Sequence, residues 1–220
     1  MVVRERKAPE AVEENTRGKI LSAAGDVFAE HGFEGATIRA ITERAGVNIA
    51  AVNYHFRDKS ELYTRVVLDA CSLPAAWRSA ADAASSPDER LRRLIYYFLR
   101  GLLDPERPAW KRRLMAREMS EPTEALDVLV ENNIRPFRDG FLVPVLTDLT
   151  GGRCTDRQLS LLSASIMGQC IYYLQSQPII VRLYPDFKLG NAEILEIAEH
   201  ISRFSLAGIA GLNQQARRPS

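Results

Sequence analysis

The sequence predicts an all-α protein, with a small N-terminal three-helix domain that contains a helix-turn-helix and a larger helical domain after it. Apolar residues recur at helical spacing along almost the whole chain, and no hairpin dipeptide stands between alternating runs. With 220 residues, 46% of them hydrophobic and 26% charged, the chain can bury a core. We expect a mobile arm over residues 1–15, a helix-turn-helix domain over 16–63 and the larger domain over 64–220.

The first helix is expected from about residue 16 to residue 30. Its apolar residues form one stripe, and residues 1–15, which are rich in charge, alanine and glutamate, precede it as the arm. His31 and Gly32 are expected to end it. The stripe consists of Ile20, Leu21, Ala24, Val27 and Phe28.

Two short helices follow, over residues 38–45 and 49–55. Thr37 and Asn48 are placed as their N-caps, and Gly46 as a left-handed C-cap between them. Two short helices joined by a tight glycine-containing turn behind a longer helix are typical of a helix-turn-helix.

The second of these helices lies in the stretch GVNIAAVNYHFRDKSELY, which is unusually polar and aromatic for a core segment. Such a helix enters the major groove of DNA. Ile49, Ala50 and Ala51 would approach base edges, while Val52 and Phe56 anchor the helix. That leaves Tyr54, His55 and Lys59 free to donate to phosphates. Each of these three also has a structural alternative: Tyr54 could pack on the first helix, His55 could cap a carbonyl, and Lys59 could be solvated.

Further helices are expected to the end of the chain. Asp58 and Glu61 are expected to form a capping box at the start of a fourth helix, which ends near residue 72. Pro136 and Pro144 should kink or divide the longest of the helices. The remaining ranges are about 88–103, 109–119, 123–149, 155–176 and 190–212.

Several classes of protein are disfavoured. The sequence contains no run of 18 apolar residues, so no membrane span is predicted, and the charged N-terminus does not resemble a secretory signal. The three cysteines, Cys71, Cys154 and Cys170, suit reduced thiols. Together these features favour a cytoplasmic protein. Three dispersed histidines and the lack of a phosphate loop or HExxH predict no catalytic residue, no metal and no cofactor. Against DNA binding, the first 65 residues hold ten basic and ten acidic side chains, although a few well-placed cations suffice.

Residues 17–63 strongly resemble the DNA-binding domain of the TetR family of bacterial transcriptional regulators. The resemblance is carried by ILSAAGDVFAEHGFEGATI, AGVNIAAVNYHF and DKSELY, and it is highly specific. REMSEPTEAL, RPF and SASIMGQCIYY resemble, less specifically, the ligand domain of the CecR subgroup. The resemblance implies a repressor that binds palindromic operator DNA as a homodimer and is released by a small-molecule effector. Alternatives are an architectural DNA-binding protein without an effector, which the 150 residues after the motif disfavour, and, last, an enzyme.

Family contacts carry over to individual residues of this chain. Thr37, His55 and Lys59 match phosphate-contacting positions, and Arg39 matches a position that can read guanine; Arg39 could also be an ordinary surface arginine. Many family members have tyrosine at the position of Asn53, although asparagine can pair with adenine. The recognition-helix positions are Asn48, Ala50, Ala51, Asn53 and Tyr54.

The larger domain offers candidate effector-contacting residues, each of which could equally be an ordinary core residue. Arg117 could hold an anionic effector or form an internal ion pair. The other candidates are Phe98, Trp110, Met115, Met119, Phe137, Phe141 and Tyr172.

The last two long helices are expected to form the dimer interface through two apolar stripes. The alternative is that both stripes are buried within one protomer. The first stripe runs through Leu159, Leu162, Ser163, Ile166, Met167, Cys170 and Tyr173, and the second through Ile194, Ile197, Ala198, Ile201, Phe204, Ser205 and Ile209.

Overall fold

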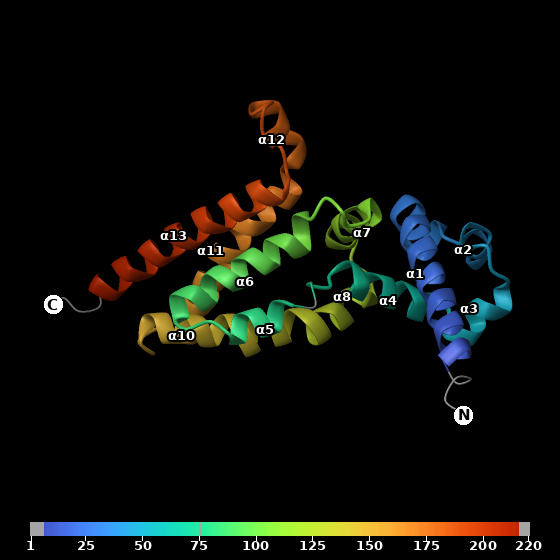
Figure 1. Cartoon of the computed structure of the whole chain (residues 1–220), viewed down its shortest axis with the longest axis horizontal. Helices are drawn as coiled ribbons and strands as arrows, with labels where there is room; N and C mark the ends of the chain where they lie inside the picture. Colours follow the sequence, from blue (N-terminus) through green and yellow to red (C-terminus); the bar gives the residue numbers. More distant parts are fainter. Residues whose placement is uncertain (1–6, 75, 216–220) are drawn as a thin grey trace, which may run out of the picture. The chain divides into compact units, whose positions relative to one another are not determined.

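The computed structural model describes residues 7–74 and 76–215, with side chains from residue 13 onward. Every secondary-structure element in these residues is helical, which confirms the all-α class (Figure 1). The described residues form two compact units: unit 1 contains residues 7–71 and 108–130, and unit 2 contains residues 72–74, 76–107 and 131–215. The polypeptide therefore passes between the units three times, so three covalent connections join them.

Unit 1 combines the N-terminal helices with two helices that come more than 35 residues later. Its core is continuous from the first helix to the last and includes Phe28, Leu62 and Leu114, all completely buried. The helices are α1 (Lys7–Gly35), α2 (Ile38–Ala45), α3 (Ile49–His55), α4 (Lys59–Ala70), α7 (Ala109–Ser120) and α8 (Glu124–Leu129).

The helix-turn-helix is confirmed, including its caps. Thr37 and Asn48 accept hydrogen bonds from the backbone of Ala40 and Ala51, and Gly46 has the left-handed conformation, with φ 65°. Asp58 caps α4 by accepting from the Glu61 amide. These signals are local, so the sequence alone placed both short helices correctly.

The first helix differs from its predicted range. It begins at Lys7, so residues 7–15 are helical rather than an arm, while residues 1–6 lie outside the described residues. The alanine and glutamate content of this stretch, which suggested a solvated arm, equally favours a helix. At the other end, Gly32 leaves helical geometry, with φ 71° and ψ −179°, as expected for a terminator, and a further turn continues to Gly35.

The ring of Trp110, on α7, packs directly against the backbone of α1 at Gly25. A Cβ atom at Gly25 would lie only 2.4–2.6 Å from atoms of the Trp110 ring, so a residue larger than glycine would push the two helices apart. The ring is 4% exposed and belongs to the core of unit 1. The close approach of α1 and α7 therefore requires this glycine.

A fully buried carboxylate joins α4, α7 and the start of α8. The Tyr63 hydroxyl donates to Glu118 Oε2 at 2.5 Å, while the Thr123 amide and hydroxyl donate to Oε1 at 2.8 and 2.9 Å. Burial, and then the bond to Glu118, raise the pKa of Tyr63, so its hydroxyl stays protonated as a donor. The carboxylate is thus supplied with three donors in place of water.

Unit 2 is a helical bundle whose core contains Leu94, Leu99, Val145 and Ile194. In the bundle α6 lies along α13, and α10 and α11 pack against both. The helices are α5 (Trp77–Asp82), α6 (Pro87–Leu103), α9 (Arg135–Phe137), α10 (Val143–Thr150), α11 (Asp156–Gln175), α12 (Gln177–Leu183) and α13 (Asn191–Gln215).

The long helix expected over 123–149 is divided by two π-helical segments, η1 (Val130–Ile134) and η2 (Arg138–Leu142). A proline ring clashes with the carbonyl four residues earlier. For Pro136 that residue is Asn132, in η1, and for Pro144 it is Gly140, in η2. The wider π turns make room for the proline rings, so the chain stays helical through both prolines instead of ending its helix at each of them.

Two short helices, α5 and α12, were not predicted. Each spans at most seven residues, which is too short for a helical apolar period to stand out. Among the described residues, no helix is long and apolar enough to cross a membrane.

We predict that Glu118→Ala destabilises unit 1 by about 2–4 kcal/mol, because three donors, one from buried Tyr63 and two from half-buried Thr123, would lose their acceptor. Urea unfolding followed by circular dichroism measures the change. Glu121→Ala is the matched control, since Glu121 is exposed and forms only a surface pair with Arg117 at 3.5 Å; it should cost less than about 0.5 kcal/mol. Equal effects of the two substitutions would show that the buried network contributes nothing.

Candidate functional site

Helix α3 has one buried and one exposed side. Val52 and Phe56 are each 2% exposed and anchor the helix, as predicted. Asn53 and Tyr54 face solvent, and so does Ile49, which is 56% exposed. An apolar side chain in the first turn of a recognition helix can contact the methyl group of thymine. Ala50 is also exposed and Ala51 is half-buried, so the start of the helix has no bulky polar group to hold it away from a base edge.

The two N-cap residues use their side-chain oxygens within the protein. Thr37 Oγ1 accepts from the Ala40 amide at 3.1 Å, and Asn48 Oδ1 accepts from the Ala51 amide at 2.9 Å. Both residues are exposed. Their first role is therefore to fix where α2 and α3 begin, and the N-terminus of α2 carries the partial positive charge that attracts a phosphate.

Arg39 lies on the surface of α2 with 86% of its side chain exposed. Its Nε is 2.8 Å from Glu43 Oε1, one helical turn away. A surface pair of this kind contributes little to stability and is easily exchanged for another acceptor. Arg39 is therefore free to bind a base or a phosphate.

Lys59 is placed differently from the prediction that it is free to donate to phosphate. Its Nζ donates to the carbonyls of Phe33 and Ala36 at 2.9 and 3.3 Å and lies 4.5 Å from the centre of the Phe33 ring. The ammonium group thus supplies hydrogen-bond donors to carbonyls at the end of α1 and links α4 to that end. It keeps at most one of its three N–H groups for an external acceptor.

Tyr54 and His55 occupy the last turn of α3. Tyr54 is 72% exposed, so it is not packed in the core, and its hydroxyl donates to Glu13 of α1 at 3.3 Å. His55 is half-buried, with its ring set edge-on to Tyr54 at 5.0 Å. Sequence reasoning missed Glu13 because that residue fell within the expected arm.

The eight candidate effector residues are divided between the two units. Trp110, Met115, Arg117 and Met119 lie on α7 in unit 1, where Trp110 is a core residue. Arg117 pairs with Glu121, and its guanidinium would lie 2.7–2.8 Å from a Cβ at Gly32, so it packs against the end of α1. The ion pair that Arg117 forms is thus a surface pair at the end of α7 and not an internal one.

Three of the other four candidates form an aromatic cluster in unit 2 together with Trp77. Trp77 lies 4.5 Å from Phe141 and 5.5 Å from Phe137, measured between ring centres, and Phe98 stacks on Phe137 at 5.7 Å. Arg78 lies over Trp77 and Phe141 at 5.2 and 5.3 Å. The sequence analysis did not include Trp77 among the candidate effector residues, because it begins the unpredicted helix α5. The three phenylalanines are half-buried, and two of them belong to or adjoin the π segments, which often mark functional sites.

The stripes assigned to the dimer interface are mostly buried within unit 2. Leu159, Ile166 and Cys170 of α11 and Ile194 and Ile201 of α13 all belong to its core. Most of both stripes is therefore buried within one protomer, whereas Phe204 of the second stripe is 65% exposed. Other faces of these helices are exposed. On α11 the exposed face consists of Leu161, Ala164, Ser165, Gly168 and Tyr172, and on α13 of His200, Phe204, Ala207 and Gly208.

Tyr172, the last effector candidate, belongs to this exposed α11 face rather than to the aromatic cluster. It lines an open hollow of about 350 Å³ between α11 and α13, together with Gly168, Gln169, Tyr173, His200 and Ile201.

Family models match most of the chain. Residues 20–66 match the bacterial regulatory proteins of the tetR family, and residues 87–209 match the C-terminal domain of the HTH-type transcriptional dual regulator CecR. The chain is 38% identical over 97 residues to the repressor AcnR of Corynebacterium efficiens, a match that spans 45% of that protein and 44% of this one. It is 27% identical over 186 residues to CecR of Shigella flexneri, covering 77% of this chain and 80% of that protein.

Solved structures show the same fold. A protein described as a transcriptional regulator, from Pseudomonas aeruginosa PAO1, superimposes with a TM-score of 0.66 at 22% identity over 96% of this chain and 97% of that chain. FadR of Bacillus subtilis, solved with stearoyl-CoA, superimposes with a TM-score of 0.64 at 14% identity over 87% of this chain and 98% of that chain. With the family models matched to both its N-terminal helices and its C-terminal domain, the chain belongs to the TetR family of transcriptional regulators and carries a CecR-type C-terminal domain.

Proposed function

We propose that this protein is a cytoplasmic repressor that binds an inverted-repeat operator as a homodimer and leaves it when a small molecule binds unit 2. The observation that carries the proposal is the exposed side of α3, where Ile49, Asn53 and Tyr54 face solvent on a helix anchored by Val52 and Phe56. A polar and aromatic surface of this kind on a recognition helix suits the major groove.

The proposed base and phosphate contacts divide by geometry. Arg39 and Asn53 are exposed and can reach base edges, with Ile49 beside them for a thymine methyl group. Thr37, Tyr54 and His55 lie at the ends of α2 and α3, where they suit phosphates. Lys59 contributes its remaining N–H and its charge, and otherwise holds α4 in place.

The proposed dimer uses the exposed faces of α11 and α13. Their small residues, such as Ala164, Gly168 and Gly208, allow two helices to approach closely, and Leu161 and Phe204 supply larger apolar contacts. Two helices from each protomer would form a four-helix bundle. The two α3 helices would then read half-sites one turn apart, about 34–36 Å, or a multiple of that distance.

The proposed effector site is the aromatic cluster of Trp77, Phe98, Phe137 and Phe141, which suits an apolar or aromatic ligand, with Arg78 as a cation beside it. The segment η1 begins at Val130, where the chain passes from unit 1 to unit 2. A ligand that favours one arrangement of the π segments would therefore act on the end of α8. Such a ligand shifts the population between two states by its difference in affinity for them.

Replacing Arg39 with alanine should reduce discrimination at one base pair by about 1–3 kcal/mol and leave stability unchanged. Lys59→Ala should weaken binding to all DNA alike, and it should also lower stability because two carbonyls lose their donor. Arg135→Ala is the matched control for Arg39→Ala, since Arg135 forms the same kind of one-turn surface pair with Glu131, in unit 2. The measurement is a titration of DNA selected by the protein from a random pool, beside an unselected duplex. Equal losses on both duplexes would exclude Arg39 as a base reader.

Phe204→Asp should convert the dimer to a monomer, because a charge would be buried in the interface without a partner. Phe204 is 65% exposed in the single chain, so the fold should survive the substitution, whereas Ile201 is buried and is unsuitable for this test. The control is Leu195→Asp, which is comparably exposed on the opposite side of α13. Sedimentation equilibrium measures the mass; a dimer that persists in the Phe204 variant would place the interface elsewhere.

An effector should quench or shift the fluorescence of Trp77, and this response should disappear in Trp77→Phe. Trp110, the second of the two tryptophans, reports on unit 1 and serves as the internal reference. Compounds found by this signal should weaken operator binding by about 5- to 150-fold, the usual range of allosteric coupling. Compounds that bind tightly near Trp77 without changing operator affinity would contradict the repressor mechanism and favour a DNA-binding protein without an effector switch.

A further inference from the structure

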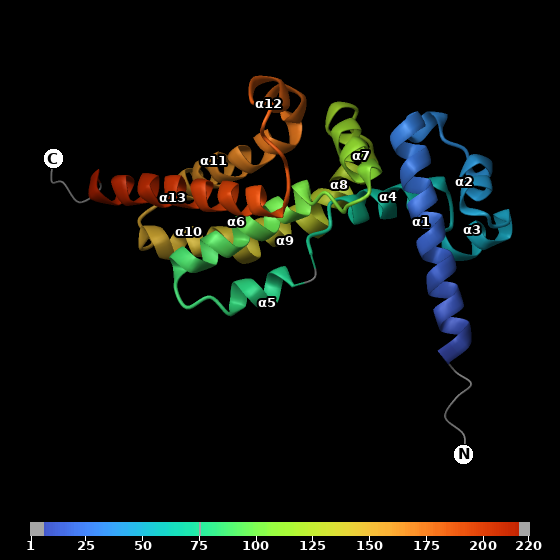
Figure 2. The ribbon, with the colours of Figure 1, turned by 45° about the horizontal axis from the view of Figure 1, so that its top comes forward.

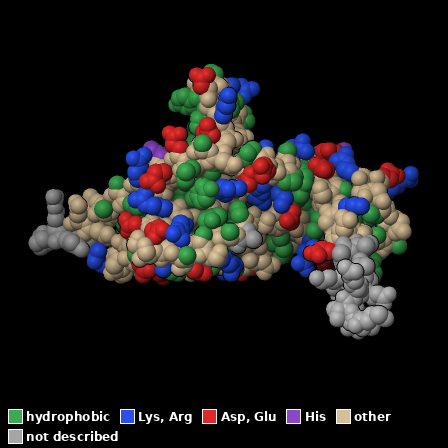
Figure 3. All heavy atoms as spheres, in the orientation of Figure 1, with side chains coloured by type: hydrophobic (Ala, Val, Ile, Leu, Met, Phe, Trp, Pro, Cys, Tyr) green, Lys and Arg blue, Asp and Glu red, His purple; other side chains and the backbone are tan. Residues whose placement is uncertain are grey.

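Helix α12 has apolar residues on every side and yet stands at the surface. Five of its seven residues are apolar, and of these only Ile180 is buried. Figures 1 and 2 both show the helix projecting from the bundle formed by the rest of unit 2, and Figure 3 shows apolar side chains on this projection beside acidic and basic ones. A helix that is hydrophobic all round is normally buried, and a helix of seven residues is not stable alone in water.

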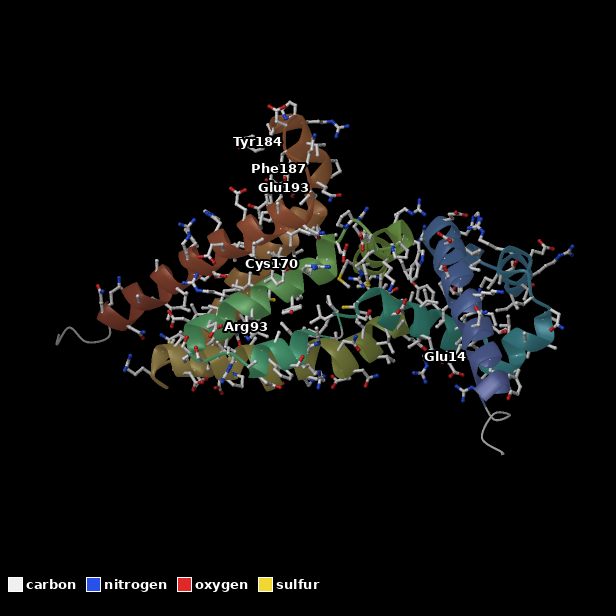
Figure 4. All side chains as sticks on the ribbon, viewed as in Figure 1. Glu14, Arg93, Cys170, Tyr184, Phe187 and Glu193 are labelled. Carbon is white, nitrogen blue, oxygen red and sulfur yellow. The ribbon has the colours of Figure 1, made fainter. Side chains whose placement is uncertain are left out.

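The projecting segment is fixed to unit 2 at its base. Ile180 is 3% exposed. Phe187, which follows the helix, stacks on Tyr173 of α11 with ring centres 6.4 Å apart, and Glu193 accepts a hydrogen bond from the Gly190 amide at 3.1 Å. Figure 4 labels Tyr184, Phe187 and Glu193 along the return of the chain to α13. The apolar surface is thus held in a definite position, as a preformed binding surface would be.

We propose that residues 177–184, called the arm from here on, pack on a second copy of the chain and extend the proposed dimer interface. The inference rests on the proposed homodimer. By chain order the arm lies between α11 and α13, whose exposed faces form that interface. Most of the large apolar residues exposed in the described structure lie in these three helices and Tyr184 rather than elsewhere. In the proposed dimer a partner covers the arm and the two faces at once.

The exposed faces of α11 and α13 are poor in large side chains. Ala164, Ser165, Gly168, Ala207 and Gly208 bury little apolar area each, whereas a specific interface buries about 800 Å² per partner and depends on large central anchors. The arm adds four exposed anchors. They are Ile179, Val181, Leu183 and Tyr184, which are 46–63% exposed.

The symmetry of a two-fold dimer favours reciprocal packing. Each contact in such a dimer occurs twice, so one arm from each protomer meets the same surface on the other. The hollow of about 350 Å³ lined by Tyr172, Tyr173 and His200 lies on the α11–α13 face and is open to incoming side chains. A partner's apolar residues would fill it, and the same contact would repeat across the axis.

The test combines the double substitution Ile179→Asp and Leu183→Asp with sedimentation equilibrium of the full chain. Both residues are more than half exposed, so the protomer should keep its fold, which circular dichroism and a urea transition verify. The dimer dissociation constant should rise by at least about tenfold, since four buried charges would enter the interface. Ile134→Asp is the control: Ile134 is an exposed apolar residue of η1, away from α11–α13 in the sequence, and its substitution should leave the constant unchanged.

Hydrogen exchange separates the arm from the dimer itself. Amides 180–184 should be protected in the wild-type dimer and lose that protection in the monomeric Phe204→Asp variant. An unchanged dissociation constant in the arm variant, or equal protection in monomer and dimer, would overturn the arm proposal while the dimer stands, leaving another protein or a membrane surface as the occupant. A Phe204→Asp protein that stays dimeric would instead refute the proposed α11–α13 interface.

Discussion

Unit 1 depends on the three hydrogen bonds that are donated to the buried carboxylate of Glu118. An ionised group without water costs several kcal/mol unless donors replace the solvent, and here Tyr63 and Thr123 provide three of them. Separating α4 from α7 or α8 would leave those donors and the carboxylate unpaired. Tyr63 also packs edge-on against Phe28 at 4.8 Å and Phe33 at 5.1 Å, so the same side chain joins α4 to α1. The position of the recognition helix, which α4 follows directly, therefore depends on residues about 60 positions further along the chain.

This arrangement bears on how a ligand could affect DNA binding. Because α7 and α8 belong to the same compact unit as the helix-turn-helix, the boundary between the two units falls at residues 71, 107 and 130 rather than once after the motif. In the proposed mechanism the aromatic cluster and the π segments lie on one side of the third crossing, and the Glu118 network lies on the other. A change in the π segments would act on α8 and, through Thr123 and Glu118, on α4.

The sequence predicted the features that are set by neighbouring residues. Caps at Thr37, Asn48 and Asp58 and the left-handed Gly46 depend on a few adjacent positions, and they placed the helix-turn-helix correctly. Features decided by packing between distant segments could not be read in this way. An apolar stripe such as that of Ile166 and Cys170 looks the same whether a neighbouring helix or a second copy covers it. Likewise, nothing near Lys59 in sequence indicates that the carbonyls of Phe33 and Ala36 lie within reach.

Helices α7 and α8 fold with the helices of the helix-turn-helix and not with the bundle of unit 2, whose two segments precede and follow them in sequence. Native-state hydrogen exchange in increasing urea measures this directly, because amides of one cooperative unit open with one free energy and one urea dependence. Amides in α1, α4, α7 and α8 should merge into a single opening reaction, distinct from that of α6 and α13. If the α7 and α8 amides opened together with those of α6 and α13 instead, the division of the chain at residues 107 and 130 would be wrong.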